Sequence, residues 1–200
     1  MLKSLSTAPP KNATYADLVA LPEHLVGEIL NGELIASPRP AAPHATATSV
    51  LGMDIGSPFQ RGRGGPGGWW IMFEPELHFN DDVLVPDLAG WRKERMPEVP
   101  NQAWFDLPPD WICEVVSPST ARIDRIRKMP IYARPSVSHA WLVDPLQRTL
   151  EVFRLQEQRW VVIGNYEGNV TVRAESFDVI ELELGALWLP EVPAQPTDER

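Results

Sequence analysis

The stretch that decides the fold is PDWICEVVSPST, Pro109–Thr120. Its centre, Trp111–Val116, holds aromatic, aliphatic and thiol side chains with one carboxylate, Glu114, among them. Successive side chains of a strand alternate between its two faces, so both faces of this segment are apolar. The pattern is typical of a strand in the middle of a covered sheet. A buried carboxylate is costly unless it gains a partner or a cation, so the position of Glu114 calls for an explanation.

Length and composition indicate one folded domain. The chain has 200 residues, of which 44% are hydrophobic and 22% charged, and these values argue against disorder. We expect a disordered leader over residues 1–12, a single domain over 13–190 and a flexible tail over 191–200. No apolar run approaches the roughly 20 residues that span a bilayer, and the N-terminus lacks a signal-peptide core. The sequence therefore predicts a cytoplasmic protein that does not enter a membrane.

Charge and cysteine content limit the classes of function. The chain has 18 Lys and Arg against 27 Asp and Glu, a net charge of −9, which argues against a protein that covers nucleic acid with a basic surface. A local basic segment, Arg122–Arg134, still permits a cationic cleft. The single cysteine, Cys113, excludes an internal disulfide and a thiolate metal site, and its apolar strand favours a small buried core residue.

The remaining segments predict a short N-terminal helix, two longer helices and several strands around this central strand. Thr14 caps a short helix, Asn31-Gly32 forms a two-residue hairpin, and a second helix begins after Pro43. The glycines of Arg61–Gly68 lack the context of a phosphate-binding loop. Pro130 should kink or break the last turn of the later helix. The other predicted elements are strands over residues 69–79, 83–91 and 139–145, a helix over 117–135, a hairpin over 148–166, and short strands from 171 onward. Together they make an α/β or α+β domain with a mixed, mostly antiparallel sheet.

Two acids within apolar strands suggest a metal site. Asp87 lies in the strand VLVPDLAGW, and a Pro-rich loop then leads to the strand that holds Glu114. Carboxylates on neighbouring strands repel each other unless a proton or cation lies between them. Mg²⁺ suits such a place, because it often takes only one or two carboxylates and keeps waters for a phosphate. Lys128, on the helix that follows, would complete the site.

Each feature also has a simpler interpretation. Asp87 can bind backbone amides at the end of a strand, and Glu114 can be neutral or paired with an arginine. Asp124 and Lys128 are four residues apart with the acid first, the favourable order for a surface ion pair, so their helix can be a solvated basic face.

Several motifs together resemble the Uma-two family, restriction-endonuclease-like proteins of the PD-(D/E)XK nuclease superfamily. The resemblance covers about residues 14–190 and includes the hairpin sequence GEILNGEL. Its motifs are PD at Pro86-Asp87, E-V-x-S-P-S-T from Glu114, D-x-x-x-K-x-x-x-Y at Asp124, Lys128 and Tyr132, and W-L-V-D-P from Trp141.

The resemblance implies a restriction-endonuclease-like core, a mixed sheet flanked by helices, with an N-terminal hairpin and C-terminal antiparallel strands. Asp87 matches the acid of the PD motif and Glu114 the acid of the (D/E)XK motif. Val116 stands where the superfamily usually has its lysine, and that lysine matches Lys128 on the following helix. Glu28 matches a further acid of the family.

Three further positions bear on the resemblance. His44 matches a recurring histidine, although a lone histidine that opens a helix is more often a cap or a surface residue. Y-A-R-P-S-V-S-H-A-W replaces the family's usual Y-A-R-x-G-V-P-E-Y-W. Pro130 lies two residues after Lys128 and can distort the helix that must aim the lysine.

The implied function is a metal-dependent endonuclease that hydrolyses DNA. Asp87, Glu114 and the carbonyl of Val115 would hold one or two Mg²⁺ (or Mn²⁺) ions. Lys128 would orient the attacking water or stabilise the transition state, and Glu28 would assist through water or a second metal.

Two other functions and one assembly stay open. A non-catalytic nucleic-acid or partner-binding module can keep the fold without the chemistry, and a hydrolase can act on another phosphate ester. A homodimer can form through the C-terminal strands, near Trp141, Trp160 and Trp188, although these tryptophans are equally ordinary core residues.

Overall fold

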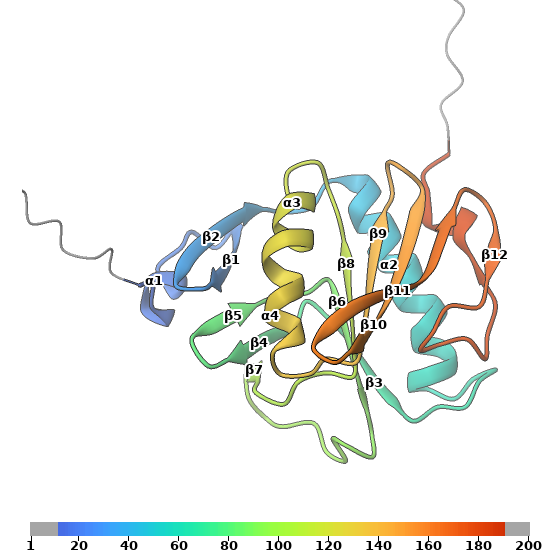
Figure 1. Ribbon diagram of the computed structural model, residues 1–200, viewed down its shortest axis with the longest axis horizontal. Helices are drawn as coiled ribbons and strands as arrows, with labels where there is room; N and C mark the ends of the chain where they lie inside the picture. The colour runs from blue at the N-terminus through green and yellow to red at the C-terminus, as the bar shows by residue number, and fades with distance from the viewer. Residues whose placement is uncertain (1–11, 191–200) are drawn as a thin grey trace, which may run out of the picture.

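Two sheets organise residues 12–190, the part of the chain that this computed structural model describes (Figure 1). The larger sheet has the order β11-β10-β9-β8-β6-β3, with β3 Trp69–Phe73, β6 Leu88–Arg92, β8 Trp111–Val115, β9 His139–Asp144, β10 Thr149–Gln156 and β11 Arg159–Glu167. The smaller has the order β2-β1-β5-β4-β7, with β1 Leu25–Leu30, β2 Glu33–Pro38, β4 Glu76–Phe79, β5 Asp82–Leu84 and β7 Trp104–Phe105. Only the β8–β9 and β4–β7 pairs in these sheets are parallel.

Helices cover both faces of the larger sheet. The helical elements are α1 Tyr15–Val19, α2 Ala42–Ile55 with a π-helical extension Gly56–Gln60, α3 Ala121–Ile123, a π-helical segment Asp124–Lys128, α4 Met129–Ala133 and a 3-10 turn Leu184–Leu187. In Figure 1, α2 and the α3–α4 helix lie on opposite sides of β8 and β9. A short pair, β12 Thr171–Val172 and β13 Leu182–Glu183, lies near the C-terminal end of the described chain. The predicted α+β class and the sheet flanked by helices are confirmed.

The central strand β8 is buried on both faces, as its sequence predicts. Trp111, Cys113 and Val115 pack into one core cluster with α2, while Ile112 and Val116 pack into the other with α4. Each of the five strand residues is buried. Glu114 therefore lies in a strand that has no solvent-exposed face.

Two predicted strands are each divided by a proline. Residues 69–79 form β3 and β4, in different sheets, and residues 82–92 form β5 and β6, again in different sheets. Pro75 and Pro86 lie at the breaks, and Glu74 has a positive φ of 45°. A proline cannot donate a ladder hydrogen bond inside a sheet, so each run changes sheet there. The prediction of two continuous strands was wrong.

The local N-terminal predictions are correct. Thr14 caps α1 in a reciprocal capping box with Asp17. The turn between β1 and β2 has φ values of 53° at Asn31 and 80° at Gly32, the positive values that an Asn-Gly hairpin turn adopts. This turn fixes the hairpin that brings Glu28 toward the larger sheet.

The later helix continues past Pro130 through Ala133, so the expected break does not occur. The distortion takes another form: Asp124–Lys128 is π-helical, and the N–H of Met129 donates to the carbonyl of Asp124. A π-helical turn widens the helix at the point where the proline ring would meet the preceding turn.

Some of the other predictions concern residues outside the described range, and the rest can be compared with the structure. The proposed tail, residues 191–200, and residues 1–11 of the proposed leader lie outside the described residues. Between 12 and 190, no helix is long and apolar enough to cross a membrane. Trp141 and Trp188 are core residues, with exposures of 0% and 5%, so neither offers an interface. Trp160 is half-buried and donates to the carbonyl of Met129.

Candidate active site

A cavity of about 350 Å³ collects the residues that the sequence singled out. It lies between the β1–β2 hairpin, the start of α2, the ends of β6 and β8, and the loop that leads into α3. Its lining includes all six: Glu28, His44, Asp87, Glu114, Val115 and Lys128. Segments from four separate parts of the chain therefore form one site.

Asp87 lies beside the end of β8. The register of β6 and β8 pairs Leu88 with Cys113, which brings Asp87 next to Glu114 and Val115. The Oδ2 atom of Asp87 accepts a hydrogen bond of 2.7 Å from the N–H of Val115. Because the N–H and C=O of one strand residue point to the same edge, the Val115 carbonyl also points toward Asp87. The interpretation of Asp87 as an acceptor for a strand-end amide is correct for this one oxygen.

The other oxygen of Asp87 contacts His44. Its Oδ1 atom lies 3.1 Å from Nε2 of His44, in the first turn of α2. Burial alone lowers the pKa of His44, but the contact with Asp87 outweighs it and raises the pKa above its ordinary value. His44 is thus part of the site rather than a surface residue or a cap.

Lys128 is buried between carboxylates and is 3% exposed. Its Nζ atom lies 2.8 Å from Oε1 of Glu28 and 2.8 Å from Oε1 of Glu114. It lies 3.9 Å from Oδ1 of Asp124, which is 4% exposed. The interpretation of this helix face as solvated was therefore wrong for Asp124 and Lys128. Glu114 is paired with a lysine and not with an arginine.

Tyr132 also binds Glu114, and the sequence reasoning gave it no role. Its hydroxyl donates a 2.5 Å hydrogen bond to the same oxygen, Oε1, that Lys128 contacts. Asp124 likewise received only a surface role. The available signal was the spacing of Asp124, Lys128 and Tyr132, four residues apart, which places all three near one side of a helix. The π-helical segment that contains Lys128 is a feature often found at functional sites.

Burial and crowded charge shift the pKa values of the cluster. Burial raises the pKa of Glu114 well above its usual value, and Lys128 offsets this effect only in part. Burial also raises the pKa of Asp124, to about 6. Burial alone lowers the pKa of Lys128, but the negative charges of Glu114, Glu28 and Asp124 outweigh this effect. They hold the pKa of Lys128 well above its ordinary value. The lysine is therefore a fixed positive charge among carboxylates.

Glu28 links the smaller sheet to this cluster. Its Oε1 atom accepts a 2.8 Å hydrogen bond from the N–H of Val85, in addition to its contact with Lys128. The hairpin β1–β2 thus supplies a third carboxylate to the surroundings of the lysine. With Asp87 in the same cavity, negative charge exceeds the charge of one ammonium group when these acids are ionised.

The donor set suits a hard divalent cation that keeps part of its water shell. Asp87, Glu114 and the Val115 carbonyl supply oxygen atoms at one end of the β6–β8 pair. Lys128 and Tyr132 both contact Oε1 of Glu114. No three His, Cys, Asp or Glu side chains in that range converge into a metal cage. Mg²⁺ does not need such a cage, since one or two carboxylates suffice.

Comparison with known proteins gives the family. A family model named Uma2, described as "putative restriction endonuclease", matches residues 15–185. The chain is also similar to a solved structure described as a "putative nuclease belonging to DUF820" from Anabaena variabilis ATCC 29413. The identity is 25% over 88% of this chain and 97% of that chain, with a TM-score of 0.70. No protein with a curated description matches the chain.

Both findings support a nuclease function in general and agree with the restriction-endonuclease-like core that the resemblance implied. Because the family model covers most of the chain, from α1 to the 3-10 turn at Leu184–Leu187, the chain belongs to the Uma2 (Uma-two) family.

Proposed function

We propose that the protein is a metal-dependent endonuclease that hydrolyses DNA phosphodiester bonds, with Mg²⁺ or Mn²⁺ as its cofactor. The observation that carries the proposal is the convergence of Asp87, Glu114 and the buried Lys128 on one cavity. Carboxylates that hold a metal ion and a cationic group beside the phosphate are recurring parts of metal-assisted phosphoryl transfer.

Asp87, Glu114 and the Val115 carbonyl would hold the ion. When bound, the ion lowers the pKa of a water and neutralises charge on the phosphate oxygens. The protein's own contribution is to hold these oxygens rigidly. Asp87 is fixed by the Val115 amide and Glu114 by Lys128 and Tyr132.

Lys128 would orient the attacking water or stabilise the negative charge that builds on the phosphate. Its pKa, held well above the ordinary value by Glu114, Glu28 and Asp124 against the effect of burial, makes it unsuited to act as a proton acceptor. Its compact ammonium group acts instead as a point charge. Glu28 keeps the lysine in place through the 2.8 Å contact and presents a further carboxylate to the cavity.

The test is conversion of supercoiled plasmid to nicked or linear DNA in Mg²⁺ or Mn²⁺, with EDTA as the control. Wild type should cleave, and Glu114→Gln should not, because Gln keeps the shape and removes the charge that holds the ion. A small phosphodiester, bis(p-nitrophenyl) phosphate, is the second substrate. Cleavage of it without cleavage of plasmid would move the assignment to a hydrolase of other phosphate esters.

One observation favours a second candidate, a non-catalytic nucleic-acid or partner-binding module. Lys128 already neutralises part of the charge of Glu114 and Glu28 that a metal ion would otherwise neutralise. A module of this kind would bind its partner equally well as wild type and as Glu114→Gln, and would leave plasmid intact with every metal tested.

A further inference from the structure

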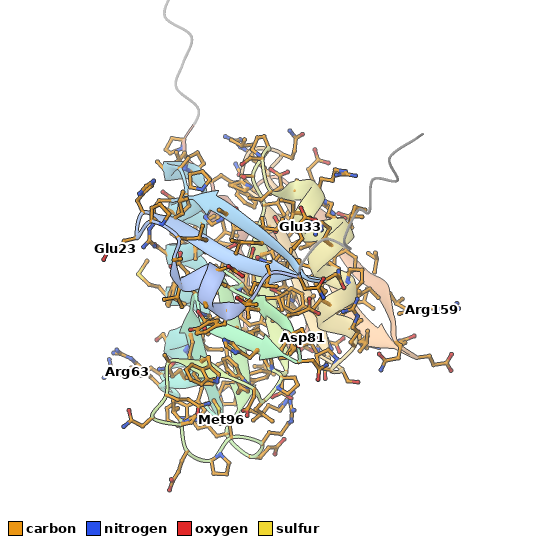
Figure 2. All side chains as sticks on the ribbon, turned by 90° about the vertical axis from the view of Figure 1, so that its left-hand side faces the viewer. Glu23, Glu33, Arg63, Asp81, Met96 and Arg159 are labelled. Atoms are coloured by element: carbon orange, nitrogen blue, oxygen red, sulfur yellow. The ribbon has the colours of Figure 1, made fainter. Side chains whose placement is uncertain are left out.

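A second cavity, of about 510 Å³, lies beside the candidate active site and has a different character. Among residues 12–190, the charged residues that line it are Arg61 and Arg63, both exposed. Two large apolar side chains in its lining are also exposed: Phe73 by 53% and Met53 by 63%. Figure 2 shows Arg63 projecting from one edge of the molecule. Exposed aromatic surface beside arginines is a combination that suits a nucleic acid strand.

Phe73 lies next to the candidate metal ligands. It pairs with Leu88 across β3 and β6, so it is one step along the ladder from Asp87. The N–H of the next residue, Glu74, donates a 3.1 Å hydrogen bond to the carbonyl of Asp87. Glu74 lines the first cavity and Phe73 the second. Consecutive residues of the chain therefore line the two cavities at this point of the sheet.

Helix α2 runs alongside both cavities. His44, near its start, lines the first cavity, and Gly52, near its end, lines the second. At a rise of about 1.5 Å per residue, these positions are about 12 Å apart along the helix. That span is about that of three or four stacked nucleotides at roughly 3.4 Å each. The part of a nucleic acid strand that reaches from one cavity to the other is therefore a few nucleotides long.

The absence of a side chain at Gly52 leaves room for the ring of Phe73 against α2. A Cβ atom at Gly52 would lie 2.0 Å from Cζ of Phe73, so only glycine admits the ring at this place on the helix. The ring is packed on that side while half of its surface stays exposed. An aromatic side chain fixed in this way loses little conformational freedom when a base stacks on it.

We propose that this second cavity binds an unpaired DNA segment that flanks the scissile phosphate, with a base stacked on Phe73 and phosphates bound by Arg61 and Arg63. The inference rests on the proposed function, which puts the scissile phosphate at Asp87. A single aromatic ring can stack only on a base whose face is free, and the bases inside a duplex cover each other's faces. The substrate class that fits is single-stranded DNA, or a duplex with a frayed or flipped segment.

The loop geometry and the overall charge agree with this assignment. Arg61 and Arg63 alternate with glycines, and Gly62 and Gly64 have positive φ values of 66° and 77°, which direct this loop along a path that other residues rarely adopt. The net charge of −9 argues against general attraction to DNA, so binding is expected to depend on local cationic sites of this kind.

The experiment measures binding without catalysis. A fluorescein-labelled oligothymidylate strand, and a blunt duplex of the same length, are titrated with the full chain in EDTA at low salt, and fluorescence anisotropy is recorded. We expect the single strand to bind more tightly. Phe73→Ala should weaken binding of the strand at least about five-fold, the lower end of the range for loss of one stacked base.

The variants separate stacking from loss of folding. Phe73→Trp should restore binding, because it again offers a ring, and Gly52→Ala should weaken it by displacing Phe73. Arg61→Ala with Arg63→Ala should reduce the slope of log Kd against log salt by about 1.4, at roughly 0.7 per phosphate on a single strand. Arg159→Ala, an exposed arginine that projects from the opposite edge in Figure 2, is the charge control and should bind as wild type does.

Equal binding of the strand by wild type and Phe73→Ala, or tighter binding of the duplex, would overturn the inference even if the protein cleaves plasmid. Binding that depends on Phe73 in a protein that cleaves no DNA with any metal would uphold the single-stranded DNA site at Phe73 and overturn the nuclease assignment, together with the placement of a scissile phosphate at Asp87. The two proposals therefore fail in different assays.

Discussion

The Nζ atom of Lys128 lies 2.8 Å from Oε1 of Glu114, and each of the two side chains is 3% exposed. Water that would screen this pair is excluded, so the interaction is stronger than that of a surface ion pair and each partner depends on the other. The lysine reaches the carboxylate from a helix that follows the strand.

Lys128→Ala should lower the free energy of unfolding by about 3–5 kcal/mol at neutral pH, because it leaves Glu114 and Glu28 as buried carboxylates without their cation. Urea unfolding followed by circular dichroism measures the change. Arg122→Ala removes an exposed charge from the same helix and should change stability by no more than about 0.5 kcal/mol. Equal, small effects from both variants would mean that the buried ion pair does not exist in solution.

Tyr132→Phe removes the hydroxyl that donates to Glu114 and nothing else. Loss of a hydrogen bond to a charged group costs about 1.5–3 kcal/mol of stability. Because Tyr132 orients a candidate metal ligand, cleavage should also fall by about 10- to 100-fold. Plasmid cleavage rates are measured for Tyr132→Phe and for a control, Tyr166→Phe, which makes the same change on β11. Full activity of Tyr132→Phe would show that Tyr132 takes no part in cleavage.

Glu28→Gln keeps the acceptor for the Val85 amide and removes one carboxylate from the surroundings of Lys128. With less negative charge in the cavity, half-maximal cleavage should need about 10-fold more Mg²⁺. The control is Glu33→Gln on the same hairpin, a side chain 65% exposed, whose Mg²⁺ dependence should match that of wild type. An unchanged Mg²⁺ titration for Glu28→Gln would show that this acid takes no part in holding the ion.

Asp124→Asn should change how stability depends on pH. Burial raises the pKa of Asp124 from 3.8 to about 6, so the folded state favours its protonated form. That contribution to stability is fully present below about pH 4 and is lost as pH rises through about 6. Between pH 4 and 7, measured in EDTA, the variant should gain up to about 3 kcal/mol relative to wild type.

The control for this measurement is Asp178→Asn, which removes an exposed carboxylate on another segment. Unfolding free energies are determined for all three proteins at each pH. A difference between Asp124→Asn and wild type that stays constant from pH 4 to 7 would contradict the buried position of this acid.

The central strand shows what the sequence can predict. The continuous apolar run from Trp111 to Val116, interrupted only by Glu114, was enough to identify a strand buried on both faces, because such a run places apolar side chains on both faces. The same reasoning failed at residues 69–79 and 83–91. There apolar residues lie on both sides of Pro75 and Pro86 while the chain moves from one sheet to the other, and an apolar pattern carries no information about which sheet a strand joins.

The site was predictable in its residues but not in its contacts. The resemblance named Asp87, Glu114, Lys128 and Glu28, and the fold brings all four to one cavity. The burial of Lys128 was not predictable, because four-residue spacing to an acid is equally typical of a surface pair. Only the hairpin β1–β2, far away in sequence, supplies the Glu28 carboxylate that contacts this lysine in the interior.

The measurement that tests the central claim most directly is titration of the protein with Mn²⁺, followed by electron paramagnetic resonance of the free ion, for wild type, Asp87→Asn and Glu114→Gln. The account predicts that wild type takes up the ion and that both variants lose this uptake while their circular dichroism spectra stay unchanged. Equal uptake by all three folded proteins would contradict the assignment of Asp87 and Glu114 as the ligands of a catalytic metal.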